Sequence, residues 1–214
     1  MWRQYRSFKP DEFIVVGADT AAGGGDRCAA QFLSKTYLDV PLVYHSEITA
    51  TEMTNLIYPK LNEIYDQTKV KSVIAYERNN GGSFEMERLA TLNREGKFKL
   101  FVMPIIGQVD PSEGIRYGWE TNTATRPAML SALKEAIDKR VLKIYDKRTI
   151  EEMLSFVVVK TSASWKAQAE SNAHDDLVMS LAIAWQLYQI EEPERSYQDQ
   201  QLRHIYHERL NEEY

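Results

Sequence analysis

The feature that most constrains this chain is an alternation of short apolar runs with segments of helical periodicity. The runs expected to form strands are Phe13–Ala18, Arg27–Ser34, Val40–His45, Val70–Tyr76, Leu100–Ile106, Leu142–Tyr145 and Phe156–Lys160. The segments expected to form helices begin at Thr51, Ser83, Pro127, Thr149 and Ala173, and a long loop or hairpin is expected over Gly107–Thr125. Three strands joined by short loops come first, and strands alternate with helices afterwards. This order predicts an α/β fold whose sheet opens with a three-strand meander.

The composition fits one globular domain. The 214 residues are 43% hydrophobic and 27% charged, which is enough to bury a substantial core. We expect a single domain over residues 1–192 and a charged tail over 193–214, because the tail has too few apolar positions to bury by itself. The sequence has no apolar run of bilayer length and no secretory signal at its start, so we expect an intracellular protein with no membrane partner.

The net charge of −5 does not favour a nucleic-acid-binding protein, because such proteins are usually basic. The objection is limited, since carboxylates clustered in a metal site make the total more negative until the metal binds. The single cysteine, Cys28, excludes an intrachain disulfide and a zinc site built from cysteines.

Acidic residues stand where strands end and where the last helix begins. Asp19 and Glu77 each follow an apolar run, and the adjacent Asp175 and Asp176 stand at the head of the apolar segment AHDDLVMSLAIAW. A carboxylate at the end of a buried strand is costly unless a cation or a hydrogen-bond donor compensates it. Because α/β folds gather functional residues at strand ends and helix starts, these four side chains are predicted to be the catalytic residues and the ligands of one metal site.

Each acid taken alone also has an ordinary structural explanation. Asp19 precedes a glycine-rich turn and could bond the backbone of its own loop, and Glu77 could pair with the arginine that follows it. Asn172 and Asp175 have the spacing of an N-cap and an acid in the first turn, so capping alone could explain Asp175. Asp176 is not explained in this way. The joint arrangement in an α/β order favours the metal site.

A cluster of oxygen ligands is typical of sites for Mg²⁺ or Mn²⁺. With two ions about 4 Å apart, one activates an attacking water and the other stabilises the leaving oxygen of a phosphodiester. The acids therefore predict phosphodiester hydrolysis.

Four segments together resemble a known family. They are GADTAAGGGD, AYERNNGG, GWETNTATRPAML and AHDDLVMSLAIAW. Over roughly residues 13–188 the chain is similar to the C-terminal nuclease domain of the large terminase subunit of tailed double-stranded DNA bacteriophages. The resemblance implies a ribonuclease H-like mixed sheet, with a three-strand antiparallel meander plus parallel strands, flanked by helices.

The same resemblance implies roles for the acids and for partners. Asp19 would bridge two ions, Glu77 would hold one, and Asp175, Asp176 or both would complete the set. The implied activity is a divalent-metal-dependent endonuclease that cuts concatemeric double-stranded DNA during genome packaging, in the cytoplasm of an infected bacterial host. The implied partners are the terminase ATPase domain, the small terminase subunit and the portal. The chain departs from the complete subunit in one respect: it contains no G-x-x-x-x-G-K-[ST] phosphate loop, so ATP-driven packaging is not assigned to it.

Five further residues are candidates for supporting roles. His174 could orient a water or a carboxylate, and Lys166 lies in the run that leads to the last helix. Arg126, Lys160 and Trp119 are candidates for contacts with DNA. Any one of these residues is more often an ordinary surface or capping residue.

Other functions remain open at this stage. The same fold could serve a four-way-junction resolvase or a transposase-type nuclease. Asp-Thr followed by glycines also suits a sugar kinase or actin-like ATP-binding domain, and a DNA-binding or assembly module without catalysis is the least enzymatic alternative.

Overall fold

The computed structural model describes residues 1–21, 27–103, 115–160, 165–169 and 174–194, with backbone alone for 156–160 and 165–169. The strands are β1 (Trp2–Gln4), β2 (Ile14–Asp19), β3 (Cys28–Ser34), β4 (Asp39–Ser46), β5 (Ser72–Tyr76), β6 (Phe98–Leu100), β7 (Lys143–Ile144), β8 (Phe156–Lys160) and β9 (Trp165–Ala169). The helices are α1 (Ala50–Thr68), α2 (Gly82–Leu92), α3 (Thr125–Asp138), α4 (Lys147–Leu154) and α5 (Asp176–Ile190).

The described strands form a mixed sheet and a separate hairpin. The sheet has the order β1-β4-β3-β2-β5-β6, with β7 paired to β4, and β8 pairs with β9 alone. β2, β3 and β4 form the antiparallel meander, whereas β5 lies parallel to β2 and β6 parallel to β5. The predicted meander and the mixed α/β sheet are therefore confirmed.

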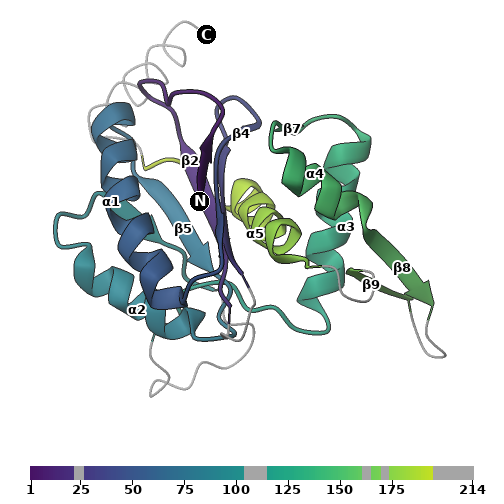
Figure 1. Ribbon diagram of the computed structural model, residues 1–214. Coiled ribbons are helices and arrows are strands. Elements are labelled where there is room, and N and C mark those ends of the chain that lie inside the picture. Colours follow the sequence, from purple (N-terminus) through teal and green to yellow (C-terminus); the bar gives the residue numbers. More distant parts are fainter. Residues whose placement is uncertain (22–26, 104–114, 161–164, 170–173, 195–214) are drawn as a thin grey trace, which may run out of the picture.

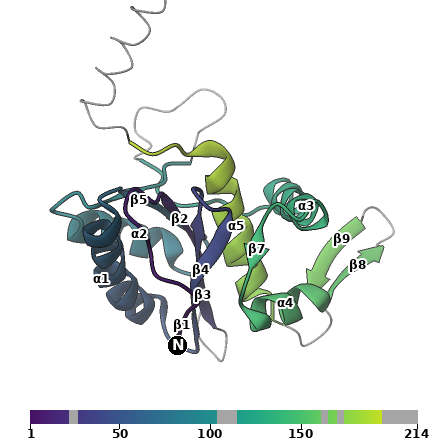
Figure 2. The same cartoon turned by 90° about the horizontal axis from the view of Figure 1, so that it is seen from above.

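Helices cover both faces of the sheet. α1 and α2 lie on one face and α5 lies on the other (Figure 1). Seen from above, α3, α4 and the β8–β9 hairpin lie beyond α5, so α5 stands between the sheet and these elements (Figure 2). α5 buries residues on all sides, as expected for a helix packed within a core.

The alternation of β2 divides the core into two parts. Ile14, Val16 and Ala18 belong to the core under α1 and α2. Val15 belongs to the core that includes α5. Because side chains alternate along a strand, Asp19 points to the same face as Val15, the α5 face.

Gly17 allows α5 to lie directly against β2. A Cβ atom at Gly17 would stand 2.2 Å from the carbonyl oxygen of Ser180 and 2.3 Å from the backbone nitrogen of Ala184. Those neighbours are backbone atoms of α5 and cannot rotate away. The absence of a side chain two residues before Asp19 therefore sets how closely α5 approaches the strand that carries it.

Several element boundaries differ from those expected. The strand expected at Leu100–Ile106 is β6, Phe98–Leu100, because pairing with β5 ends at Leu100; residues 104–106 lie outside the described part. The last helix begins at Asp176 instead of Ala173, and 170–173 are also outside it. The sequence does not predict β1 or β9, whose short or polar runs lack a clear period.

The loop expected over Gly107–Thr125 is described only from residue 115, and its end lies along the sheet. Tyr117 forms a bridge with Val102, and Trp119 forms a parallel bridge with Glu77. The proposed tail stays a prediction, because 195–214 lie outside the described residues. None of the described helices has the length and apolarity that crossing a bilayer requires.

Replacing Gly17 with Ala tests the contact between β2 and α5. The added methyl meets α5 backbone, so we expect Gly17→Ala to lower the free energy of unfolding by about 2–3 kcal/mol. The matched control is Gly96→Ala, where the added atom has open space and only the φ of 62° is unfavourable, at a cost of about 1 kcal/mol. Denaturant unfolding measures both. Equal losses in the two variants would contradict the close contact.

Candidate functional site

Two neighbouring parallel strands bring Asp19 and Glu77 together. Ala18 is paired with Tyr76 in register, and the backbone nitrogen of Glu77 donates to the oxygen of Ala18 at 2.7 Å. Asp19 ends β2 and Glu77 follows β5, so the two carboxylates stand at the same edge of the sheet. Each residue is only 7% exposed.

The turn after β5 fixes the position of Glu77. The Asn79 side-chain nitrogen donates to Glu77 Oε1 at 3.2 Å, and the Asn79 carbonyl accepts from the Gly82 nitrogen at 2.9 Å. Gly81 has a φ of 87°, which favours glycine, and a Cβ atom at Gly82 would stand 1.8 Å from the Glu77 carbonyl oxygen. The Asn-Asn-Gly-Gly run therefore forms the turn and also orients the Glu77 carboxylate.

The head of α5 completes an acidic cavity of about 660 Å³, which we call the acid cavity. Its lining includes Asp19, Glu77, Asp175, Asp176, Arg126 and His174. The four acids predicted from the sequence thus line one cavity, together with His174 and Arg126.

The two aspartates at the head of α5 differ in their surroundings. Arg126 Nη2 donates to Asp175 Oδ2, and the Asp175 side chain is 32% exposed. Asp176 is 15% exposed, and its Oδ2 is buried without a hydrogen-bond partner among the described residues. The nearest cationic candidates, His45 Nε2 and His174 Nδ1, are each 3.9 Å from that oxygen, beyond hydrogen-bond distance.

The capping explanation of Asp175 is wrong. α5 begins at Asp176, so Asp175 occupies the N-cap position and not the first turn, and its side chain makes no capping hydrogen bond. The capping hydrogen bond comes from Glu152 of α4 instead. Its Oε1 accepts from the backbone nitrogen of Val178, in the first turn of α5, at 2.7 Å. The acid that caps α5 thus comes from another helix. This leaves both aspartates free to face the cavity.

The sequence gives no local signal for Glu152. Its partner is 26 residues away along the chain, and Glu152 stands in a helix beside another glutamate, Glu151. Only the packing of α4 against α5 shows that Glu152, and not Glu151, reaches the head of α5.

The acids raise one another's proton affinity. Burial, the neighbouring Glu77 carboxylate and the charge of Asp176 raise the pKa of Asp19 well above its usual range. Burial, opposed by the hydrogen bond from Val178 and reinforced by the charges of Asp175 and Asp176, raises the pKa of Glu152 to about 8. In both cases burial makes the largest contribution, and the charges of neighbouring acids act in the same direction.

The donor set fits a hard divalent cation in its chemistry, and all four acids line one cavity. The cavity offers carboxylate oxygens, of which Asp176 Oδ2 is buried and unpartnered. Within the described residues, no three His, Cys, Asp or Glu side chains are already arranged as ligands of one ion. Asp175 is paired with Arg126, so its carboxylate is not available to a metal ion in this arrangement. Ligation would therefore require side-chain rotation within the cavity.

The structure places the residues that were expected to contact DNA in different surroundings. Trp119 is 6% exposed and stacks on Phe101 at 5.8 Å, so its assignment as a DNA contact is wrong: the ring belongs to the core, and its backbone pairs beside Glu77. Arg126 binds Asp175 at the cavity. Lys160 and Lys166 lie on the paired strands β8 and β9, and their side chains are outside the described part.

No model of a known protein family matches the sequence, and a comparison with curated proteins found no match. Solved structures do match. The large terminase nuclease of thermophilic phage G20c with bound magnesium has a TM-score of 0.62 at 16% identity, covering 86% of both chains. The large terminase nuclease domain of Thermus phage P74-26 has a TM-score of 0.59 at 16% identity, covering 89% of this chain and 85% of that one. The Mn-soaked human cytomegalovirus terminase nuclease domain has a TM-score of 0.55 at 15% identity, with 82% of each chain covered.

The chain has the fold of large terminase nuclease domains. The ribonuclease H-like mixed sheet expected from the sequence is therefore confirmed.

Replacing Glu152 with Gln tests its raised pKa. Because folding raises this pKa from 4.5 to about 8, the folded state binds more protons than the unfolded state between these values, and stability falls as pH rises through this window. Glu152→Gln keeps an oxygen for the Val178 nitrogen and removes the titration. We expect the variant to lose less stability than the wild type between pH 5 and pH 8, as measured by denaturant unfolding at both pH values.

Glu151→Gln, at the exposed neighbouring position, is the matched control and should follow the wild type. Parallel stability curves for Glu152→Gln and wild type would show that Glu152 does not carry this pH dependence.

Proposed function

We propose that this chain is a divalent-metal-dependent endonuclease that hydrolyses double-stranded DNA with two Mg²⁺ or Mn²⁺ ions. The observation that carries the proposal is the convergence of carboxylates from β2, β5 and the head of α5 in one cavity. The fold supports it, because solved nuclease domains of this fold bind magnesium, cobalt or zinc or were soaked with manganese.

We assign the principal ligands to Asp19, Glu77 and Asp176. Asp19 stands between Glu77 on the adjacent strand and the head of α5, which suits a bridging ligand. Asp176 is favoured over Asp175 because its buried oxygen has no partner, whereas Asp175 binds Arg126. Asp175 is then a further ligand only if Arg126 releases it.

Each protein group has a defined part in the proposed reaction. Bound divalent ions would activate the attacking water and stabilise the leaving oxygen of the phosphodiester. Arg126, next to the acids, is placed to contact a phosphate oxygen when it leaves Asp175. His174 lies at the rim with its Nδ1 3.9 Å from Asp176 Oδ2 and its side chain 47% exposed, which places it to orient a water. Lys160 and Lys166 remain proposed contacts to DNA and support for the site.

The biological setting follows from the same proposal. The substrate would be a concatemeric viral genome, cut during packaging in the cytoplasm of a bacterial host. The ATPase domain of a terminase, its small subunit and the portal would be the partners. The expected tail over residues 193–214 would extend from the nuclease domain.

Replacing Asp19 with Asn tests the proposal through two measurements: we expect the stability of the metal-free protein to rise and DNA cleavage to fall. The amide removes a buried charge that its neighbours repel, so we expect the metal-free variant to be more stable than the wild type by about 1 kcal/mol at pH 8. Cleavage of plasmid DNA with Mg²⁺ or Mn²⁺ should fall below detection. Manganese should raise the melting temperature of the wild type and not that of Asp19→Asn.

The matched control is Asp66→Asn, which removes an exposed carboxylate far from the cavity lining and should retain wild-type cleavage. Undiminished cleavage by Asp19→Asn would contradict the proposal. Two further substrates separate the alternatives: preference for a four-way junction over linear duplex would favour a resolvase, and ATP binding without cleavage would favour a kinase-like domain.

A further inference from the structure

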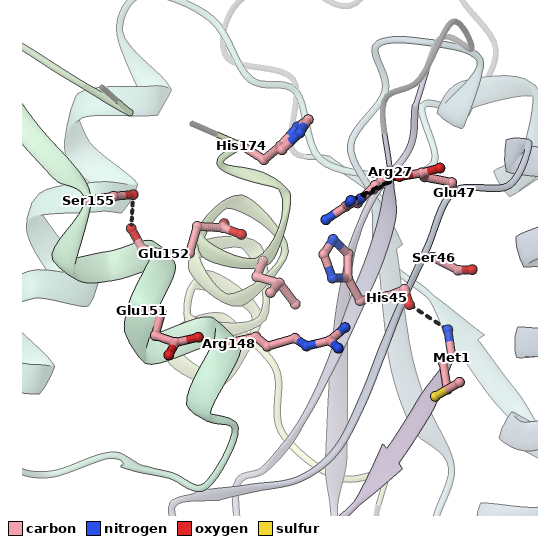
Figure 3. Close-up of a pocket in the computed structure, with 11 residues that line it drawn as sticks. Met1, Arg27, His45, Ser46, Glu47, Arg148, Glu151, Glu152, Ser155 and His174 are labelled. Atoms are coloured by element: carbon pink, nitrogen blue, oxygen red, sulfur yellow. Dashed lines mark hydrogen bonds and ion pairs between the residues drawn. The ribbon is translucent and has the colours of Figure 1, made fainter. Parts of the chain in front are cut away.

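A second cavity of about 680 Å³ adjoins the acid cavity. We call it the histidine cavity; its lining includes Arg27, His45, Glu47, Arg148, Glu152 and His174. Figure 3 shows Glu152 and Arg148 of α4 on one side and His45 of β4 on the other, directed toward the same space, with His174 at one end.

The two cavities adjoin at the head of α5, because His174 lines both of them. The first two residues of α5 are divided between them: Asp176 lines the acid cavity and Leu177 lines the histidine cavity. His45 connects them as well, with its Nε2 3.9 Å from Asp176 Oδ2. A chain of phosphates that reaches the acids can therefore extend into the histidine cavity.

One buried polar group in the histidine cavity has no partner. His45 is 6% exposed, and its Nε2 is buried without a hydrogen bond among the described residues. A buried nitrogen without a partner is unfavourable, so a ligand that forms a hydrogen bond with it removes that unfavourable contribution. The His45 side chain lines a cavity that Arg27 and Arg148 also border.

Among the described charged groups in and beside the lining of the histidine cavity, one cation is left without a partner. Glu47 is paired with Arg27 at 2.9 Å, and Glu151 is paired with Lys147 at 3.3 Å. Arg148 is exposed and forms no ion pair or hydrogen bond in the described part of the chain. An anion entering here therefore meets a free guanidinium, which suits phosphate oxygens.

Glu152 holds its proton more strongly than an ordinary glutamate. Burial raises the pKa of Glu152 to about 8, so this carboxyl opposes an anion less than an exposed glutamate would. A protonated carboxyl can donate a hydrogen bond to a phosphate oxygen, whereas a carboxylate would repel it.

We propose that the histidine cavity binds a backbone phosphate of the DNA strand beside the one held at the acid cavity, through Arg148 and His45. This inference rests on the proposed nuclease function, since that function brings the strand to the acid cavity. Arg148 supplies the charge, and His45 Nε2 supplies a fixed hydrogen bond in a buried position. The cavity then sets the path of the strand past the acids.

The test compares Arg148→Ala with Lys134→Ala in DNA binding. Both variants remove one positive charge from an exposed helical position, but only Arg148 lines the histidine cavity; Lys134 lies on α3 and pairs with Asp138. Binding of a fluorescent duplex is measured in EDTA, which prevents cleavage, over a range of salt concentrations. We expect Arg148→Ala to bind about 3–10-fold more weakly and to reduce the slope of log K against log salt by about 1, with Lys134→Ala close to wild type.

A second variant and a second probe complete the test. His45→Phe keeps a ring in the same place and removes the nitrogen, and we expect it to weaken binding by about 2–5-fold while its melting temperature confirms folding. Inorganic phosphate is titrated by calorimetry against wild type and Arg148→Ala.

The outcomes separate the inference from the function on which it rests. Equal DNA affinity and salt slope in Arg148→Ala and Lys134→Ala would overturn the phosphate subsite while leaving the nuclease proposal intact. Inorganic phosphate binding that depends on Arg148, with unchanged DNA affinity, would assign the cavity to free phosphate and also overturn it. Failure of every variant and the wild type to bind or cleave DNA would contradict the nuclease function itself.

Discussion

The close contact of α5 with β2 at Gly17 is the constraint on which the rest of the structure depends. Backbone atoms of Ser180 and Ala184 occupy the space that a side chain at Gly17 would fill. Because this contact fixes α5 against the strand, Asp176 at the helix head comes to the edge where Asp19 ends β2. β2 and α5 are far apart in the sequence, yet this backbone contact fixes their relative position. Catalytic side chains need to be positioned in this way.

The second constraint is electrostatic. Burying the Asp19 carboxylate beside Glu77 and Asp176 lowers the stability of the folded state. The same burial and repulsion raise the pKa of Asp19. The surroundings reduce the repulsion, because Arg126 pairs with Asp175 and because burial raises the pKa of the nearby Glu152 to about 8. What remains uncompensated is the buried oxygen of Asp176, and a divalent cation is the group that would compensate it.

The sequence predicts those parts of the fold and site that depend on local pattern. Asp19 and Glu77 stand after apolar runs, so their shared edge follows from strand periodicity and parallel pairing. The sequence cannot reveal Glu152 as the cap of α5, because that bond joins two helices across a separation that no period marks. It also misassigns Trp119, since an aromatic residue in a polar loop carries no sign of whether the loop folds back onto the core. Positions that follow from strand and helix periodicity could therefore be predicted, including the meeting of the acids, whereas the contacts of Glu152 and Trp119 could not.

The proposed metal site can be tested in a crystal of the protein soaked with Mn²⁺. We expect an ion with carboxylate oxygens of Asp19, Glu77 and Asp176 at about 2.0–2.2 Å, and Asp175 still paired with Arg126 or bound only at a second ion. Manganese bound elsewhere, or carboxylates of β2, β5 and α5 that remain apart at saturating metal, would contradict the proposed site.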